Sequence, residues 1–268
     1  MSGPSWVPAG LDADQPSGAR IYDYLLGGGH NFALDRAVGE QLMAALPGAD
    51  HVARLNRSFL RRAVLSMVSS GVRQFLDLGS GIPTVGNVHE IAQHADEQAR
   101  VVYVDWDAVA AAHSELLLEG NERATMVQAD MCVPDTILEA AETRRVLNFD
   151  EPIGLLMIGV LHFVPDEQRP GDIVAAYRDR LAAGSYLAMS HFTADTRPEE
   201  MAAAVGVSKR SSEQLCPRSR EEITALFAGF DLVEPGLVST ALWRPDSPVE
   251  LGLDADHSEI YAGVGRKP

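Results

Sequence analysis

The chain has 268 residues, 46% of them hydrophobic, so it is long enough to bury a large core as one main α/β domain. Its 22 Lys and Arg against 38 Asp and Glu give a net charge of −16, which repels nucleic acids and anionic lipids, so we expect neither as a partner. The two cysteines have no paired spacing, which predicts neither a disulfide framework nor a zinc site and fits a reducing, cytoplasmic location.

The N-terminal part of the chain reads as helical. Residues 1–16 lack the basic start and apolar core of a secretory signal and are expected to form a flexible arm. Capping and breaking residues then predict three helices, which run from Ser17 to the glycines 27–29, from Asp35 to Leu46 and from Asp50 to Ser70. We therefore expect a helical cap over residues 17–71, followed by an α/β domain over 72–268.

The third predicted helix carries an apolar stripe with arginines on the opposite side. Arg54, Arg57 and Arg61 group there, and a charged face opposite an apolar one is typical of a solvated surface helix. Asn56, however, falls inside the apolar stripe, and a buried amide needs a hydrogen-bond partner. Asn56 and its neighbour Arg57 are therefore candidates for the wall of a site.

Strands alternate with helices after Gly71, which predicts a parallel, doubly wound sheet. A strand without polar alternation, Ile153 to Val160, is expected at the centre, covered on both faces. Two late strands with no helix between them predict an antiparallel edge. The fold class is thus a Rossmann-like α/β fold with seven strands, the last antiparallel: Gln74–Leu78, Val101–Asp105, Thr125–Gln128, Ile153–Val160, Ser185–His191, Leu237–Trp243 and Glu259–Gly265.

A glycine-rich turn follows the first strand, in the sequence Asp77-Leu78-Gly79-Ser80-Gly81. Such glycines let the backbone approach a ligand closely, and Asp105 at the end of the next strand is placed to hold a ribose diol. A dinucleotide calls for a third glycine beside its pyrophosphate, where this chain has Thr84. Asp77 suits a ligand with a positive ammonium and sulfonium. The turn therefore favours S-adenosylmethionine over NAD.

Histidines supply the candidate catalytic bases. Methyl transfer is an in-line displacement, so the protein aligns the acceptor and, for oxygen or nitrogen acceptors, removes a proton. His162 and His191 follow two strands at the edge where open α/β sheets place their crevice, and His30 is a further candidate; each could equally be a structural residue. His89 and His94 lie five residues apart, whereas a zinc-binding helix needs four, so both are expected at the surface and no metal is predicted.

The turn Asp77 to Gly81 resembles motif I of the class I S-adenosylmethionine-dependent methyltransferases, with Pro83 in place of its usual third glycine. A more specific resemblance lies in residues 19–36, 75–85 and 161–166, which are similar to the actinobacterial S-adenosyl methyltransferase family, once catalogued as a domain of unknown function. The resemblance covers nearly the whole chain, from about Ser17 to Arg266.

That resemblance implies a class I methyltransferase domain over 72–268 and S-adenosyl-L-methionine as the cofactor. It implies that the turn borders the methionine part, that Asp105 accepts both ribose hydroxyls, that Asp130 and Met131 meet the adenine, and that the N-terminal helices cover the cofactor mouth. The predicted cofactor-binding residues are Tyr22, Asn31, Arg57, Asp77, Gly79, Ser80, Gly81, Asp105, Trp106, Asp130, Met131 and Val160.

The predicted function is methyl transfer to a small-molecule acceptor, which the acidic surface and the enclosing helices favour. Two alternatives stay open at this point. One is a regulator that binds S-adenosylmethionine without turnover, because the motifs specify a binding site more firmly than a base. The other, an NAD-dependent oxidoreductase, fits the turn less well because the third glycine is missing.

Overall fold

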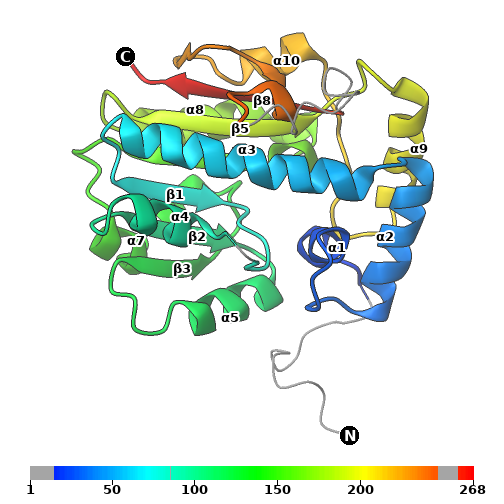
Figure 1. The fold of residues 1–268 in the computed structure, drawn as a ribbon, viewed down its shortest axis with the longest axis horizontal. Helices are drawn as coiled ribbons and strands as arrows, with labels where there is room; N and C mark the ends of the chain where they lie inside the picture. Colours follow the sequence, from blue (N-terminus) through cyan, green and yellow to red (C-terminus); the bar gives the residue numbers. More distant parts are fainter. Residues whose placement is uncertain (1–14, 85, 247–258) are drawn as a thin grey trace, which may run out of the picture.

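A computed structural model describes residues 15–84, 86–246 and 259–268 (Figure 1). The predicted flexible arm, residues 1–16, therefore lies outside the described residues except for its last two. Every structural statement below concerns the described ranges.

The described chain forms one eight-stranded sheet in the order β3-β2-β1-β4-β5-β8-β6, with β7 also paired to β8. The first five strands are parallel, and β8 is antiparallel to β5, which confirms the predicted doubly wound, Rossmann-like fold with an antiparallel last strand. The strands are β1 (Gln74–Leu78), β2 (Arg100–Asp105), β3 (Ala124–Gln128), β4 (Gly154–Ile158), β5 (Tyr186–Phe192), β6 (Asp231–Leu232), β7 (Val238–Ser239) and β8 (Ile260–Arg266).

The late strands differ from the prediction in number and position. β6 and β7 have two residues each, and the chain after β7 enters a 3-10 turn, η3 (Thr240–Leu242), instead of continuing as a strand to Trp243. β8 does not lie at the edge, because β6 and β7 pair with its outer side. Segments this short have no periodicity that a sequence could reveal.

Helices cover both faces of the sheet, as the unbroken apolar strand predicts. One face packs against α3 (Ala49–Ser69), α4 (Val88–Ala95) and α5 (Ala108–Leu117); the other packs against α6 (Pro134–Leu138), α7 (Ala141–Val146), α8 (Pro170–Arg180) and α10 (Arg220–Ala225). Figure 1 shows α3 running along its face of the sheet. Within the described ranges, no helix has the length and apolar character that a membrane span requires.

Two N-terminal helices lie at the end of the sheet toward which the parallel strands point (Figure 1). They are α1 (Gly18–Leu25) and α2 (Ala33–Ala45), and they share a small core with α9 (Pro198–Ser208). Ala19 of α1 packs against Ile82 and against Val109 and Ala110 of α5. Because α3 packs on the sheet itself, α1 and α2 are the helices of the predicted cap that lie beyond the end of the sheet.

The sheet has a topological switch point between β1 and β4. From β1 the chain winds outward to β2 and β3, whereas from β4 it winds the opposite way to β5. Open α/β sheets bind their ligands outside the carboxyl ends of the strands at such a point. The glycine turn after β1 and residues Gly159 and Val160 after β4 meet there.

The buried Arg62 ties α3 to the late part of the chain, since its guanidinium donates to the carbonyls of Trp243 (2.9 Å) and Thr240 (2.6 Å). We expect Arg62→Met to lower the free energy of unfolding by about 1 to 3 kcal/mol, because it removes both of these hydrogen bonds. Urea unfolding measures this. The control is Arg61→Met, which removes an exposed pair with Asp246 and should cost less than about 1 kcal/mol. Equal losses would contradict the assignment.

Candidate functional site

The glycine turn is held in a conformation that only glycine adopts easily. Gly79 and Gly81 both have φ of +68°, and the N–H groups of Gly79 and Ser80 donate to the Val104 carbonyl at 2.8 and 3.0 Å. A Cβ on Gly79 would lie 2.3 Å from Cγ2 of Val160. The turn therefore packs backbone directly against the residue that follows β4.

Asp105 braces this turn from the tip of β2. Its carboxylate accepts hydrogen bonds from the Gly81 N–H (2.7 Å) and the Asp107 N–H (2.9 Å). Burial raises the pKa of Asp105 to about 6, although the two N–H groups act in the opposite direction. The carboxylate predicted to hold a ribose thus also fixes the backbone of the turn.

Asp77 is buried at the tip of β1, and none of the described residues donates a hydrogen bond to its carboxylate. Only 5% of the residue is exposed, and burial raises the pKa of Asp77 to about 7, against a lowering by Arg57 and a further increase from Asp105. Burying a carboxylate without a partner is costly, so such groups are concentrated at functional sites. The site therefore suits a positively charged ligand group.

Arg57 on α3 is half-buried, and its charge acts on this carboxylate. Its guanidinium donates to the Gly86 carbonyl at 2.9 Å. Burial raises the pKa of both Asp77 and Tyr22, and the charge of Arg57 partly opposes the rise in each. Arg54 and Arg61, by contrast, have side chains that are 54% and 53% exposed. Arg54 and Arg61 thus fit the expected solvated face, whereas Arg57 is half-buried, and its candidacy for the wall of a site stays a prediction.

A chain of hydrogen bonds joins α1, α3 and β5 beside the switch point. The Tyr22 hydroxyl donates to the Ala53 carbonyl (3.0 Å) and accepts from the Asn56 side chain (3.2 Å), whose oxygen accepts from Ser190 Oγ (2.6 Å). Asn56 is 2% exposed, so the predicted burial of this amide and its need for a partner are confirmed. A Cβ on Gly159 would lie 3.0 Å from the Asn56 amide nitrogen, which places the chain against the end of β4.

The glycine-rich corner after α1 folds around the buried Asp23. Its carboxylate accepts from the His30 N–H (2.9 Å) and from the Asn31 side chain (2.8 Å), and a Cβ on Gly28 would lie 2.0 Å from it. Asn31, a predicted cofactor-binding residue, is thus engaged in shaping the corner. The His30 ring packs against that of His113 on α5, with centroids 4.0 Å apart.

The two predicted bases lie together and are deeply buried. The rings of His162 and His191 are edge to face with centroids 5.6 Å apart, and burial lowers the pKa of both, that of His191 to about 4. His191 receives a hydrogen bond from Arg218 at Nε2 (2.9 Å), so its Nδ1 carries the proton and donates to the Phe192 carbonyl (2.7 Å). Nδ1 of His162 accepts from the Phe192 N–H at 3.4 Å. Both rings are therefore neutral at neutral pH.

The remaining predicted residues lie at the tips of β2 and β3. Trp106 is 54% exposed directly after Asp105, and Asp130 is exposed, with one oxygen accepting from the Cys132 N–H (2.8 Å). Met131 packs in the core, and its carbonyl accepts from Tyr177 (2.8 Å). An exposed ring and an exposed acid therefore follow the tips of β2 and β3.

Sequence reasoning missed Glu213, which lies in the segment between α9 and α10. Its carboxylate accepts from the Gly18 N–H at the start of α1 (2.7 Å) and from Ser212 Oγ (2.6 Å). No motif in that segment signals this contact, which exists only because the chain folds back. His89 is also corrected: it is buried against Tyr103 (2.8 Å), not at the surface.

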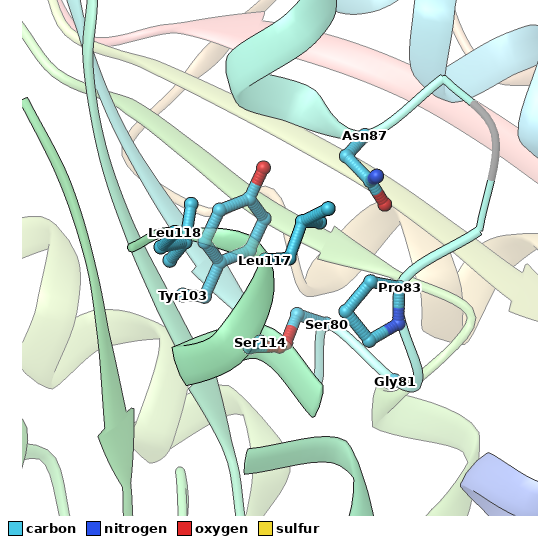
Figure 2. A pocket seen from close by; sticks show the side chains of 8 residues that line it. All are labelled: Ser80, Gly81, Pro83, Asn87, Tyr103, Ser114, Leu117 and Leu118. Carbon is cyan, nitrogen blue, oxygen red and sulfur yellow. The ribbon is translucent and has the colours of Figure 1, made fainter. Parts of the chain in front are cut away.

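A small cavity lies behind the turn, as Figure 2 shows, between Ser80, Pro83, Tyr103 and Ser114. Its volume is about 10 Å³, which is room for about one water molecule. The buried Ser80 hydroxyl has no partner among the described residues. The cavity is far too small for a nucleoside, so it is a packing gap behind the turn.

The strand order, the glycine turn at the switch point and the acid on the next strand define the class I S-adenosylmethionine-dependent methyltransferase fold. The sequence profile of the S-adenosyl methyltransferase family matches residues 4–268. The chain therefore belongs to that family, whose cofactor is S-adenosyl-L-methionine. The family and the fold implied by the sequence motifs are both confirmed.

Two solved structures are similar to the chain over nearly its whole length. One is a candidate methyltransferase from Thermobifida fusca, with 40% identity, a TM-score of 0.92 and coverage of 98% of this chain and 99% of that one. The other is a DUF574 family protein from Streptomyces avermitilis, with 38% identity, a TM-score of 0.92 and coverage of 96% and 99%.

A more distant structure, human N-acetylserotonin methyltransferase in complex with S-adenosylmethionine, shares 15% identity at a TM-score of 0.50 over 92% of this chain and 62% of that one, which shows similarity of fold alone. No curated protein matches the chain in sequence.

The two turn glycines provide a matched pair. Both have the same positive φ, but a Cβ on Gly81 would meet nothing within 4 Å, whereas one on Gly79 would collide with Val160. Without ligand, we expect Gly81→Ala to cost about 1 to 2 kcal/mol for the left-handed backbone. Gly79→Ala should cost about 1 to 3 kcal/mol more because of the collision.

Urea unfolding measures the difference, and Val160→Ala in the Gly79→Ala background should restore part of the loss. Equal losses for the two glycine variants would show that the close approach is not the constraint.

Proposed function

We propose that the protein transfers the methyl group of S-adenosylmethionine to a small-molecule acceptor at the switch point. The observation that carries this proposal is the carboxylate of the buried Asp77, to which no described residue donates a hydrogen bond and on which the charge of Arg57 acts. The methionine part of the cofactor carries an ammonium and a carboxylate, which complement this pair of charges. A nicotinamide dinucleotide presents no such group to Asp77.

The rest of the cofactor fits the tips of β2 and β3, with the ribose at β2 and the adenine between β2 and β3. We assign the ribose hydroxyls to Asp105, the adenine amino group to Asp130 and the adenine ring to the exposed Trp106 and the backbone of Met131. The glycines at 79 and 81 supply a surface without side chains beside the sulfonium. These assignments rest on the exposure of Trp106 and Asp130 and on the burial of Asp105.

The bound cofactor supplies an electrophilic methyl group, so the protein has to align the acceptor and remove a proton. We assign the removal of this proton to His162, which is neutral and follows β4. His191, whose two ring nitrogens are both engaged, would act by supporting His162. Tyr22 and Asn56 would border the acceptor, because their hydrogen bonds place them at the end of β4.

Two further points belong to the proposal. The acceptor is a small molecule, as the covering helices α1 and α2 favour. We also infer a cytoplasmic location from Cys132 and Cys216, which are both free thiols and so suit a reducing compartment.

The direct test is transfer of label. Cofactor labelled at the methyl carbon is incubated with the protein and the small-molecule fraction of an actinobacterial extract, and labelled products are separated by chromatography. We expect at least one product that His162→Ala abolishes while S-adenosylhomocysteine still binds. If the protein binds S-adenosylhomocysteine but labels nothing in any extract, the proposed enzymatic function fails. The alternative function, a regulator that senses the cofactor without turnover, then takes its place.

Asp105 is expected to contribute to cofactor affinity directly. Asp105→Ala should weaken binding of S-adenosylhomocysteine by about 1 to 3 kcal/mol, the loss of a charged acceptor, as measured by calorimetric titration. The matched control is Asp107→Ala. Asp107 is similarly buried but caps α5 by accepting from Val109 and Ala110, so its loss should lower stability by about 1 kcal/mol and leave affinity within about threefold. Unchanged affinity in Asp105→Ala would place the ribose elsewhere.

Asp77 predicts how affinity depends on pH. Its pKa of about 7 means that the carboxyl is half ionised near neutrality, and only the ionised form attracts an ammonium. Affinity for S-adenosylhomocysteine should therefore rise between pH 6 and pH 8, and the rise should be smaller in Asp77→Asn, where the titration of Asp105 remains. Asp105 is present in both proteins, so their difference isolates Asp77.

The raised pKa of Asp77 also predicts that the stability of the ligand-free protein falls over the pH range in which its affinity rises. Because the folded pKa of Asp77 lies above its ordinary value of 3.8, its contribution to stability is complete below pH 4 and is lost as the pH rises through about 7. Ligand-free Asp77→Asn should therefore melt at a higher temperature than the parent at pH 8, while binding more weakly. A variant that is destabilised and has normal affinity would contradict this role.

A further inference from the structure

Arg218 is a buried arginine between α9 and α10, with 7% of the residue exposed. A guanidinium has five N–H donors, and each of them has an acceptor within the protein. The acceptors are Asp166 Oδ1, which takes Nε (3.2 Å) and Nη2 (2.6 Å), the Val164 carbonyl, which takes Nη2 (2.8 Å), and the Leu161 carbonyl (3.2 Å) and His191 Nε2 (2.9 Å), which both take Nη1. The role of Arg218 therefore lies in the groups that it holds.

Two of these acceptors flank His162, to which proton removal is assigned above. His162 lies in the 3-10 turn η1 (Leu161–Phe163), which follows β4. The carbonyl of Leu161 belongs to the start of this turn, and that of Val164 comes directly after its end. One guanidinium thus binds both ends of the turn that carries His162.

The same guanidinium binds the turn to the end of β5. Because a guanidinium can only donate, Nε2 of His191 accepts, and its Nδ1 donates to the Phe192 carbonyl (2.7 Å). The N–H of Phe192 in turn donates to Nδ1 of His162 at 3.4 Å. A path of hydrogen bonds therefore runs from Arg218 through His191 and the backbone of Phe192 to His162.

Backbone hydrogen bonds hold the segment that carries Arg218 without help from its side chain. The N–H of Cys216 donates to the His162 carbonyl (2.7 Å), and the N–H of Arg218 donates to the Phe192 carbonyl (3.1 Å). Both bonds remain when the side chain at position 218 is replaced. Variants at this position can therefore keep the path of the chain while losing the contacts of the guanidinium.

The charge of Arg218 also acts on the two rings. Burial lowers the pKa of His162 and of His191, and the guanidinium lowers each further. The charged and titratable groups around the guanidinium are His162 on the turn, His191 on β5, Asp166 after the turn, Glu222 on α10 and Cys216. Arg218 thus favours neutral rings, and a neutral imidazole is the form that can accept a proton.

We propose that Arg218 is a positioning residue that clamps the turn after β4 to the end of β5 and thereby holds His162 in place for methyl transfer. This proposal rests on the proposed function, because it takes His162 to remove the proton. It assigns Arg218 no contact with the cofactor, the acceptor or the reacting atoms.

Two substitutions separate the clamp from the charge. Arg218→Met removes the donors and the charge but keeps an unbranched apolar stem, whereas Arg218→Lys keeps the charge without the planar fork. Labelling is measured with methyl-labelled S-adenosylmethionine and the small-molecule fraction of an actinobacterial extract. At saturating cofactor, we expect the rate to fall about a hundredfold in Arg218→Met and about tenfold in Arg218→Lys, because a misplaced base slows the reaction. Affinity for S-adenosylhomocysteine should stay within about threefold in both, because the contacts that are lost lie outside the assigned cofactor residues.

The matched control is Arg62→Met. Arg62 is also buried, at 4% exposure, and also donates to two backbone carbonyls, those of Trp243 and Thr240. Its replacement should lower stability but leave the labelling rate within about twofold, because its contacts are independent of the two histidines. All rates are measured below the melting temperature of every variant.

Two measurements on the ligand-free protein do not depend on turnover. Hydrogen exchange of residues 161–166 should become faster in both Arg218 variants and stay unchanged in Arg62→Met. NMR titration of ¹⁵N-labelled histidine should show a raised pKa of His191 in Arg218→Met, where a positive charge is lost, but a value near that of the parent in Arg218→Lys.

The outcomes separate the two proposals. If the parent binds S-adenosylhomocysteine but labels nothing, the proposed function fails, and the positioning role fails with it. If the parent labels a product and Arg218→Met or Arg218→Lys does so at the parental rate, the function stands and the clamp is overturned. Unchanged exchange of residues 161–166 in both Arg218 variants would overturn it too. An equal loss of rate in Arg62→Met would show that Arg218 contributes only to folding.

Discussion

The site depends on two carboxylates that are buried at neighbouring strand tips. Asp77 and Asp105 follow adjacent parallel strands, so the register of β1 and β2 brings them to one edge of the sheet. Asp105 is stabilised by two backbone N–H groups, whereas among the described residues Asp77 has the opposing charges of Arg57 and Asp105 acting on it and no hydrogen bond to its carboxylate. The fold thus holds an incompletely neutralised negative charge out of water, and a ligand with a positive group can complete it.

Several features of the candidate site lower the stability of the folded protein. Glycines with positive φ bring bare backbone against Val160, and burial opposes ionisation of both aspartates. Such costs are typical of functional sites and must be offset by the rest of the molecule. The apolar packing on both faces of the sheet does so here, because α3 to α5 and α6 to α8 bury the strands from either side.

The cap is connected to the sheet through polar contacts at defined positions. Tyr22 reaches Asn56 and, through it, Ser190, while Glu213 holds the first residue of α1. These contacts set where the N-terminal helices lie relative to the switch point. They also explain why α1, α3 and the segment after α9 enclose one site although they are far apart in the sequence.

The sequence by itself determined the alternation of strands and helices, the glycine turn with its two acids, and the burial of Asn56, because periodicity and turn chemistry are local properties. Only the tertiary structure decided that β8 lies inside the sheet, that the charge of Arg57 acts on Asp77, that both ring nitrogens of His191 are engaged and that Glu213 reaches α1. These features depend on which distant segments meet, and on the exposure and charge that result. No local pattern encodes them. Arg57 groups with the exposed Arg54 and Arg61 on one helix, so its place in the sequence does not distinguish it from them.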